Sequence, residues 1–172
     1  REGSAIEDFM RPDRVVVGLE TERAKKIMAT LYRPLFLLET PIIFTSLESS
    51  ELIKYASNAF LGVKISYINQ MSDLCESVGA NIDDIAKGMG LDKRIGNKFL
   101  HTGPGYGGSC FPKDTLALVK TAKDNKTSIS LVEETVKYND LRKQGMVNKI
   151  QQAVGDIKNK DIAILGLAFK PE

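Results

Sequence analysis

One long helix is the clearest prediction from the pattern of apolar positions along the chain. Between residues 52 and 78, apolar side chains recur at intervals of four and three, which is the spacing of one face of an α-helix. This row consists of Leu52, Ala56, Phe60, Val63, Tyr67, Met71, Leu74 and Val78. Thr45 and Glu48 are spaced as a capping box before the helix, and Gly79 provides a stop after it.

A second apolar row widens the predicted buried face of this helix. It consists of Ile53, Ile65, Ile68 and Cys75. A helix with two apolar rows needs neighbours on two sides. We therefore expect one side to pack within its own domain and the other against the same helix of a second copy, giving a homodimer. In this row Cys75 is interpreted as a small buried hydrophobe.

Shorter elements are predicted on both sides of the long helix. Before it, residues 15–18 are typical of a strand, residues 20–31 of an amphipathic helix, and residues 35–44 of an extended segment interrupted by a proline. After it, Asn81 is spaced as the N-cap of a short helix. The glycines expected to end that helix are Gly88 and Gly90.

The last third of the chain predicts two more helices and a strand. Pro112 suits the first turn of a helix. Its apolar positions are Leu116, Leu118, Val119 and Ala122. Ser130 and Glu133 form a capping box for a final helix that Gly155 should end, and residues 161–167 are strand-like. The fold class is therefore mainly α: a helical central domain with one long helix, flanked at both ends by partial α/β, Rossmann-like segments.

Composition excludes several classes of protein. The chain has 172 residues, and 24 Lys and Arg against 22 Asp and Glu give a net charge of +2, which makes nucleic acid a poor partner. No apolar run approaches the roughly 18 residues of a membrane span, so no membrane association is expected. Two cysteines cannot form a disulfide framework, and the reducing cytoplasm is the expected location. The absence of an initiating Met and the strand-like end suggest an interior part of a longer protein.

Cys110 is the leading candidate for chemistry. It follows a segment with five glycines between residues 96 and 108 and precedes a predicted helix. Unpaired backbone N–H groups and the helix dipole stabilise a thiolate at such a position. Lys113 and Asp114 add a cation and a carboxylate within one turn. The alternative is a tight turn around a buried cysteine, but so many glycines indicate a backbone that approaches another group closely.

Other polar residues give weaker signals. Lys54 and Asn58 are four residues apart on the long helix and share one face, although solvation at the surface is the simpler interpretation. His101 could contact a substrate or solvent, and with two scattered cysteines it cannot complete a metal site. No G-x-G-x-x-G motif occurs, so the usual dinucleotide-binding fingerprint is absent from this sequence.

Two motifs resemble those of a known family. Residues 51–60 read ELIKYASNAF, and residues 103–114 read GPGYGGSCFPKD. Together they closely resemble the UDP-glucose 6-dehydrogenase family, and the likeness covers nearly the whole chain. It implies that residues 1–45 end an NAD-binding domain and that residues 46–158 form a central dimerisation domain carrying the Cys loop. Residues 159–172 would be the first strand of a truncated UDP-sugar-binding domain.

The resemblance implies an enzyme that oxidises C6 of UDP-glucose twice with NAD, giving UDP-glucuronate. Cys110 would hold the intermediate aldehyde as a thiohemiacetal and then as a thioester. Lys54 would stabilise the oxyanion or act as general acid and base, Asn58 would hold the same oxygen, and Asp114 would position water. The residues implied in substrate binding are Arg94, Phe99, Leu100, His101, Tyr106, Gly107, Phe169 and Lys170. Those implied in NAD binding are Glu2, Cys110 and Lys113.

Several alternatives stay open. GDP-mannose and UDP-N-acetylmannosamine dehydrogenases share the reaction, although the sequence Ser109-Cys110-Phe111 favours UDP-glucose. A non-catalytic helical dimerisation module would need only the long helix. A different thiol enzyme, such as a hydrolase, would have to use His101, the only histidine. We expect this chain alone neither to bind NAD tightly nor to reduce it, since the fingerprint is absent and the family's hydrolytic glutamate would precede Arg1.

Overall fold

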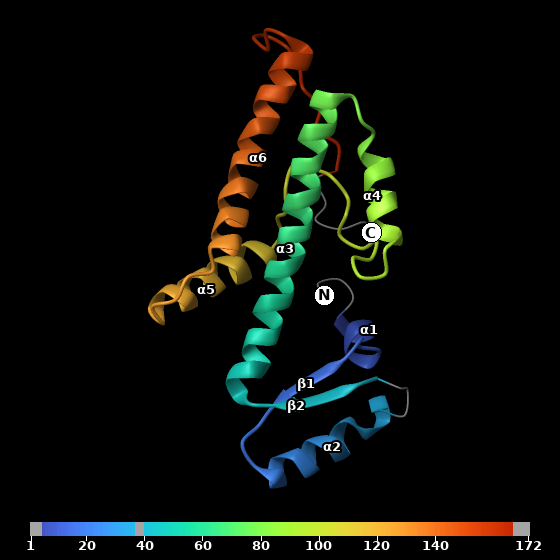
Figure 1. Ribbon diagram of the computed structural model, residues 1–172, viewed down its shortest axis with the longest axis vertical. Helices are drawn as coiled ribbons and strands as arrows, with labels where there is room; N and C mark the ends of the chain where they lie inside the picture. Colours follow the sequence, from blue (N-terminus) through green and yellow to red (C-terminus); the bar gives the residue numbers. More distant parts are fainter. Residues whose placement is uncertain (1–4, 37–39, 167–172) are drawn as a thin grey trace. The chain divides into compact units, whose positions relative to one another are not determined.

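The computed structural model describes residues 5–36 and 40–166, and Figure 1 shows their helices and strands. The described residues form two compact units, 5–54 and 55–166. Most of them are helical, which confirms the predicted fold class. Among the described helices, none combines the length and the apolar character that a membrane crossing requires.

The first unit is built around two parallel strands. In chain order its elements are α1 (Ala5–Met10), β1 (Val15–Gly18), α2 (Glu22–Phe36) and β2 (Ile42–Thr45). Val15 of β1 lies opposite Ile42 of β2, and α2 provides the crossover that a parallel pair needs. β1 confirms the predicted strand. The helix runs further than predicted, because its packing continues to the buried Leu35, and β2 forms within the segment predicted to be merely extended.

The long helix α3 spans Leu47–Val78 and confirms the main prediction. Its cap differs, because the hydroxyl oxygen of Ser46, not Thr45, accepts the backbone N–H of Ser49 at 3.1 Å. Thr45 is the last residue of β2, so the chain leaves the sheet before it can turn into the helix. Gly79, with a φ of +73°, follows the helix end as predicted.

The buried face of α3 follows the second predicted apolar row, with Ile68 and Cys75, and not the first. The buried residues are mostly small or polar, namely Ala59, Gly62, Ser66, Ile68, Asn69, Ser72 and Cys75. Much of the first row is exposed, including Phe60, Tyr67 and Leu74 at 62, 46 and 52%. Periodicity shows which side chains share a face, but not which face meets the rest of the same chain. The predicted burial of Cys75 is confirmed.

The next helix, α4, spans Ile82–Leu91. Asn81 caps it as predicted, with its side-chain oxygen accepting a backbone N–H at 2.8 Å. The helix does not end at Gly88 or Gly90 but continues through both. A Cβ at position 90 would lie 2.9 Å from the Cα of Asn97. Gly90 therefore allows the following loop to pack closely against α4 and does not end the helix.

The two glycines of α4 provide a matched pair of variants. Gly88→Ala should stabilise the protein by up to about 1 kcal/mol, because its Cβ would meet nothing within 4 Å and alanine favours a helix. Gly90→Ala should destabilise it by about 1–3 kcal/mol, because the methyl group would press on the backbone of Asn97. Urea unfolding measures both changes, and equal effects would contradict the close packing of the loop.

Two further helices complete the second unit. α5 spans Phe111–Asp124, with Pro112 in its first turn as predicted. α6 spans Ser130–Val154. Its predicted capping box is wrong: Ser130 is already helical, and Ile129 occupies the N-cap position without a side-chain cap. The helix itself begins at Ser130 as predicted, and the carbonyl of Ile129 accepts its first backbone N–H groups.

The second unit's part of α3 runs alongside α6 (Figure 1). The buried side chains of α6 are again polar, namely Thr135, Asn139 and Arg142. The strand predicted over residues 161–167 does not form in the described residues 161–166, and residue 167 lies outside them. The mostly small and polar faces of α3 and α6 therefore pack inside the unit, and many of their large apolar side chains, such as Phe60 and Leu141, are exposed.

Candidate active site

A glycine-rich loop, residues 92–110, connects α4 to α5 without helix or strand. Two buried side chains hold this loop at Gly103 from both sides. The side-chain oxygen of Asn69 in α3 accepts the N–H of Gly103 at 2.8 Å, and Nε of Arg142 in α6 donates to its carbonyl at 3.0 Å. Both backbone polar groups of Gly103 are therefore paired, although the loop has no regular structure.

A second anchor holds the loop three residues later. Asn139 of α6 binds both backbone groups of Tyr106: its Oδ1 accepts the N–H at 2.7 Å, and its Nδ2 donates to the carbonyl at 3.1 Å. Reasoning from the sequence missed the three anchors, because Asn and Arg are usually exposed. They are Asn69, Arg142 and Asn139, and all three are buried.

Aromatic rings fill the inner side of the loop. Tyr106 is 4% exposed, and its ring meets Phe111 edge-on with centroids 6.2 Å apart. The ring of Phe99 also meets the ring of Phe111 edge-on, with centroids 6.1 Å apart. Burial raises the pKa of Tyr106, which further favours the neutral phenol. Tyr106 and the buried Leu100 support the loop from within, and their predicted contact with substrate stays a prediction.

Cys110 occupies the position that the sequence predicts. It is exposed and is the N-cap residue of α5, directly before the first helical turn. Its thiol makes no capping hydrogen bond, and the hydroxyl of Ser109 lies 3.7 Å from the sulfur. The first turn of a helix presents backbone N–H groups and the positive end of the dipole, which stabilise a negative charge. Cys110 is therefore accessible to a reactant in a position that favours a nucleophile.

The structure brings together two predicted catalytic residues from different helices. Nδ2 of Asn58 in α3 donates to Oδ2 of Asp114 in α5 at 2.6 Å. Asp114 is only 1% exposed and lies one turn after Cys110. The simpler interpretation of Asn58 as a solvated surface residue is therefore wrong. Lys54 lies in the first unit, one turn before Asn58 on α3, and its role stays a prediction.

Two open pockets lie along the loop, and His101 lines both. The first has a volume of about 450 Å³. Its lining residues are Ile65, Lys98, Phe99, His101, Thr102, Gly103 and Gly105. The second, of about 390 Å³, lies between the loop and α4 and is also lined by Leu100. Both volumes are in the range of small-molecule sites.

The other predicted site residues are exposed or lie outside the described residues. The guanidinium of Arg94 is at the surface, 2.6 Å from the carboxylate of Asp92, and its hydrogen bonds lower the pKa of that carboxyl group. Gly107 and Lys113 are exposed. Glu2, Phe169 and Lys170 lie outside the described residues.

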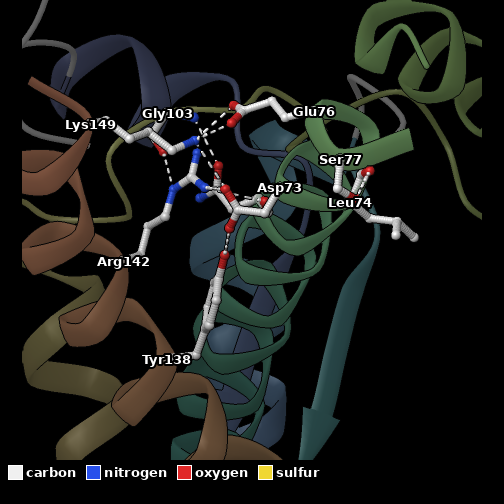
Figure 2. A network of polar contacts seen from close by, with 9 residues as sticks. Asp73, Leu74, Glu76, Ser77, Gly103, Tyr138, Arg142 and Lys149 are labelled. Carbon is white, nitrogen blue, oxygen red and sulfur yellow. Dashed lines mark hydrogen bonds and ion pairs between the residues drawn. The ribbon is translucent and has the colours of Figure 1, made fainter. Parts of the chain in front are cut away.

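A salt-bridge network joins α3 to α6 beside the first loop anchor (Figure 2). It consists of Asp73, Glu76, Tyr138, Arg142 and Lys149. Burial by itself would raise the pKa of Asp73, but hydrogen bonds and charges from Arg142 and Lys149 lower it overall. The stabilisation from this carboxylate is therefore present above about pH 4 and is lost as the pH falls through the lowered pKa.

Comparison with known proteins decides the family. The sequence profile of the UDP-glucose/GDP-mannose dehydrogenase family, central domain, matches residues 48–141, which is more than half of the chain. The chain belongs to this family. A UDP-glucose 6-dehydrogenase of Rhizobium meliloti (strain 1021) is 61% identical over 174 residues, which cover 99% of this chain and 40% of that protein. UDP-glucose 6-dehydrogenase TuaD of Bacillus subtilis (strain 168) is 47% identical over 99% of this chain, which corresponds to 36% of that protein.

Solved structures of two dehydrogenases share the fold. A UDP-glucose dehydrogenase from the archaeon Pyrobaculum islandicum matches with a TM-score of 0.84 and 36% identity, over 90% of this chain and 35% of that one. A UDP-D-ManNAc dehydrogenase from Pyrococcus horikoshii matches in fold, with a TM-score of 0.75. The chain thus spans about two fifths of the length of its curated relatives. Both motifs that indicated the family lie inside the matched region.

Proposed function

We propose that this chain forms the central part of a cytoplasmic, NAD-dependent UDP-glucose 6-dehydrogenase, which converts UDP-glucose to UDP-glucuronate. The observation that carries the proposal is the 61% identity to the Rhizobium meliloti protein across nearly the whole chain. The exposed Cys110 and the paired Asn58 and Asp114 supply the kinds of group that this reaction needs. The whole protein's activity would also need residues beyond those of this chain.

Cys110 makes a second oxidation at the same carbon possible. Its thiolate adds to the C6 aldehyde left by the first oxidation, so that a C–S bond forms, the C=O double bond opens and the oxygen takes up a proton. Loss of a hydride from C6 and of the hydroxyl proton then gives a thioester. Water cleaves the C–S bond and releases the carboxylate and the thiol. In total, C6 loses two hydrides and gains the oxygen of one water.

The residues around Cys110 would stabilise the oxygen at C6. Nδ2 of Asn58 carries two hydrogens; it donates one to Asp114 and can donate the other to substrate. Lys54, one turn earlier on α3, would place an ammonium near the same oxygen while negative charge develops. Asp114 would orient the water that attacks the thioester. Its burial and its bond to Asn58 hold the carboxylate in one direction.

NAD accepts the hydride in both oxidations when it is bound. This sequence has no G-x-G-x-x-G motif, so the usual dinucleotide-binding fingerprint is not among its residues. Cys110 and Lys113 are both exposed at the start of α5, which fits their predicted place beside the nicotinamide. His101 and Phe99 would line the sugar nucleotide in the larger loop pocket. Arg94 would exchange the carboxylate of Asp92 for a substrate phosphate.

A homodimer is part of the proposal. The exposed apolar row of α3 is large for a surface that stays in water. It includes Phe60, Tyr67, Leu74 and Val78. Tyr67 also lines a groove of about 370 Å³, and the exposed Leu131 and Leu141 of α6 line the same groove. A second copy of the same helix would cover this row, as the two apolar rows of the sequence indicate.

The test measures alkylation of the two cysteines in the full-length protein, mapped by mass spectrometry after iodoacetamide treatment. Cys110 should react much faster than the buried Cys75, and UDP-glucose should slow the reaction of Cys110 alone. An inert Cys110 would rule out the covalent route and favour the helical dimerisation module. Protection by GDP-mannose or UDP-N-acetylmannosamine, but not by UDP-glucose, would assign the other substrate.

A further inference from the structure

We infer that Arg142 is a positioning residue for the Cys110 thiol, acting through the backbone of Gly103; this rests on the proposed function. Arg142 is on α6. Among the hydrogen bonds and ion pairs of the described residues, it does not contact Cys110, and Gly103 is the one lining residue of the larger pocket that it binds. Its side chain is nevertheless only 6% exposed, and it makes three kinds of contact there. The mechanism described above does not use it.

The contacts of Arg142 converge on one point of the loop. Its Nε donates to the carbonyl of Gly103 at 3.0 Å, and its Nη1 donates to the backbone carbonyl of Asn69 at 3.4 Å. The side chain of Asn69 in turn accepts the N–H of Gly103 at 2.8 Å. One guanidinium therefore binds the loop directly and also binds the residue that holds the other side of the same glycine.

Asp73, which belongs to the network of Figure 2, orients Arg142. Nη1 of Arg142 forms an ion pair with Oδ1 of Asp73. Oδ1 also accepts Lys149 at 3.1 Å, and Oδ2 accepts the hydroxyl of Tyr138 at 3.2 Å. Lys149 reaches further to Glu76 at 2.7 Å. A planar guanidinium can satisfy three acceptors in different directions at once, which a lysine ammonium on a flexible stem does less well.

The distance along the chain links this anchor to the thiol. Tyr106, three residues after Gly103, is held by Asn139, and Cys110 follows four residues later at the start of α5. With two fixed points so near, little of the loop is left to move before the reactive sulfur. A displacement of about 1 Å at a reacting group can lower a rate by about 10²-fold. Loss of the Gly103 anchor should therefore affect turnover more than folding.

The test compares Arg142→Lys with Lys149→Met in the full-length protein. Both side chains are on α6 and both pair with Asp73, but only Arg142 binds Gly103. At a temperature where both variants are fully folded, Arg142→Lys should lower kcat by about 10²-fold, and Lys149→Met should stay near the wild type. Full kcat in folded Arg142→Lys, or an equal loss in Lys149→Met, would overturn the inference.

Hydrogen exchange at the loop amides provides a readout that does not depend on the reaction. Arg142→Lys should accelerate exchange at Gly103 and Tyr106, whereas Lys149→Met should leave both amides protected. If the wild-type protein did not oxidise UDP-glucose, the proposed function would fail, and exchange would still decide whether Arg142 holds the loop. Unchanged protection in Arg142→Lys would reject the positioning role in either case.

Discussion

Replacing Cys110 with alanine should lower kcat for UDP-glucuronate formation by at least about 10³-fold, as expected for loss of a nucleophile. Without the thiol, no covalent adduct forms at the C6 aldehyde, and the second hydride has no thiohemiacetal to leave from. The first oxidation does not need the sulfur, so aldehyde should appear where uronate is lost. Chromatographic separation of the products of the full-length variant measures both.

Cys75→Ala provides the matched control for this prediction. Cys75 is also a free cysteine, but it is buried in α3 and is no part of the proposed mechanism. Its replacement should lower stability modestly, since a small cavity forms, and should leave uronate formation close to the wild type. Normal uronate formation by Cys110→Ala would remove the covalent route from the proposed function.

The parts of the site that the sequence predicted are those set by neighbours along the chain. Cys110 could be placed before a helix because the glycines precede it and Pro112 follows it within two residues. Asn81 could be assigned as a cap for the same reason. The boundaries were less predictable, since the cap of α3 moved from Thr45 to Ser46 where β2 ends. Local signals identify an element more reliably than its first residue.

Contacts between distant segments could not be predicted. The resemblance implied that Asn58 and Asp114 serve the same site, but they are 56 residues apart and the spacing within the motifs did not indicate their direct hydrogen bond. The loop anchors Asn69, Asn139 and Arg142 are buried beneath the loop. The loop sequence has no periodic pattern, so it does not indicate which residues of α3 and α6 the loop covers. A polar residue is buried where irregular backbone needs a partner, and this depends on the path of the whole loop.

Gly105→Ala should produce the other large effect, because two independent features require glycine at this position. Its φ is +126°, a conformation that costs other residues about 1–3 kcal/mol. An added Cβ would also lie 2.7 Å from Oδ1 of Asn139, the atom that accepts the N–H of Tyr106. We expect a lower midpoint in urea unfolding and, in the folded full-length variant, a fall in kcat of about 10²-fold or more.

Gly103→Ala separates these effects from a general sensitivity of the loop. Its Cβ would meet nothing within 4 Å, and its φ is not positive, so it should cost much less than Gly105→Ala in both measurements. Adding Asn139→Ser to Gly105→Ala removes the contact but not the strain. If the double variant loses less stability and kcat than the sum of the losses of Gly105→Ala and Asn139→Ser, the effect comes from crowding against Asn139. If the losses simply add, the effect comes from the positive φ. If Gly105→Ala were as mild as Gly103→Ala, the loop would not be held at Tyr106 in the way that its hydrogen bonds indicate.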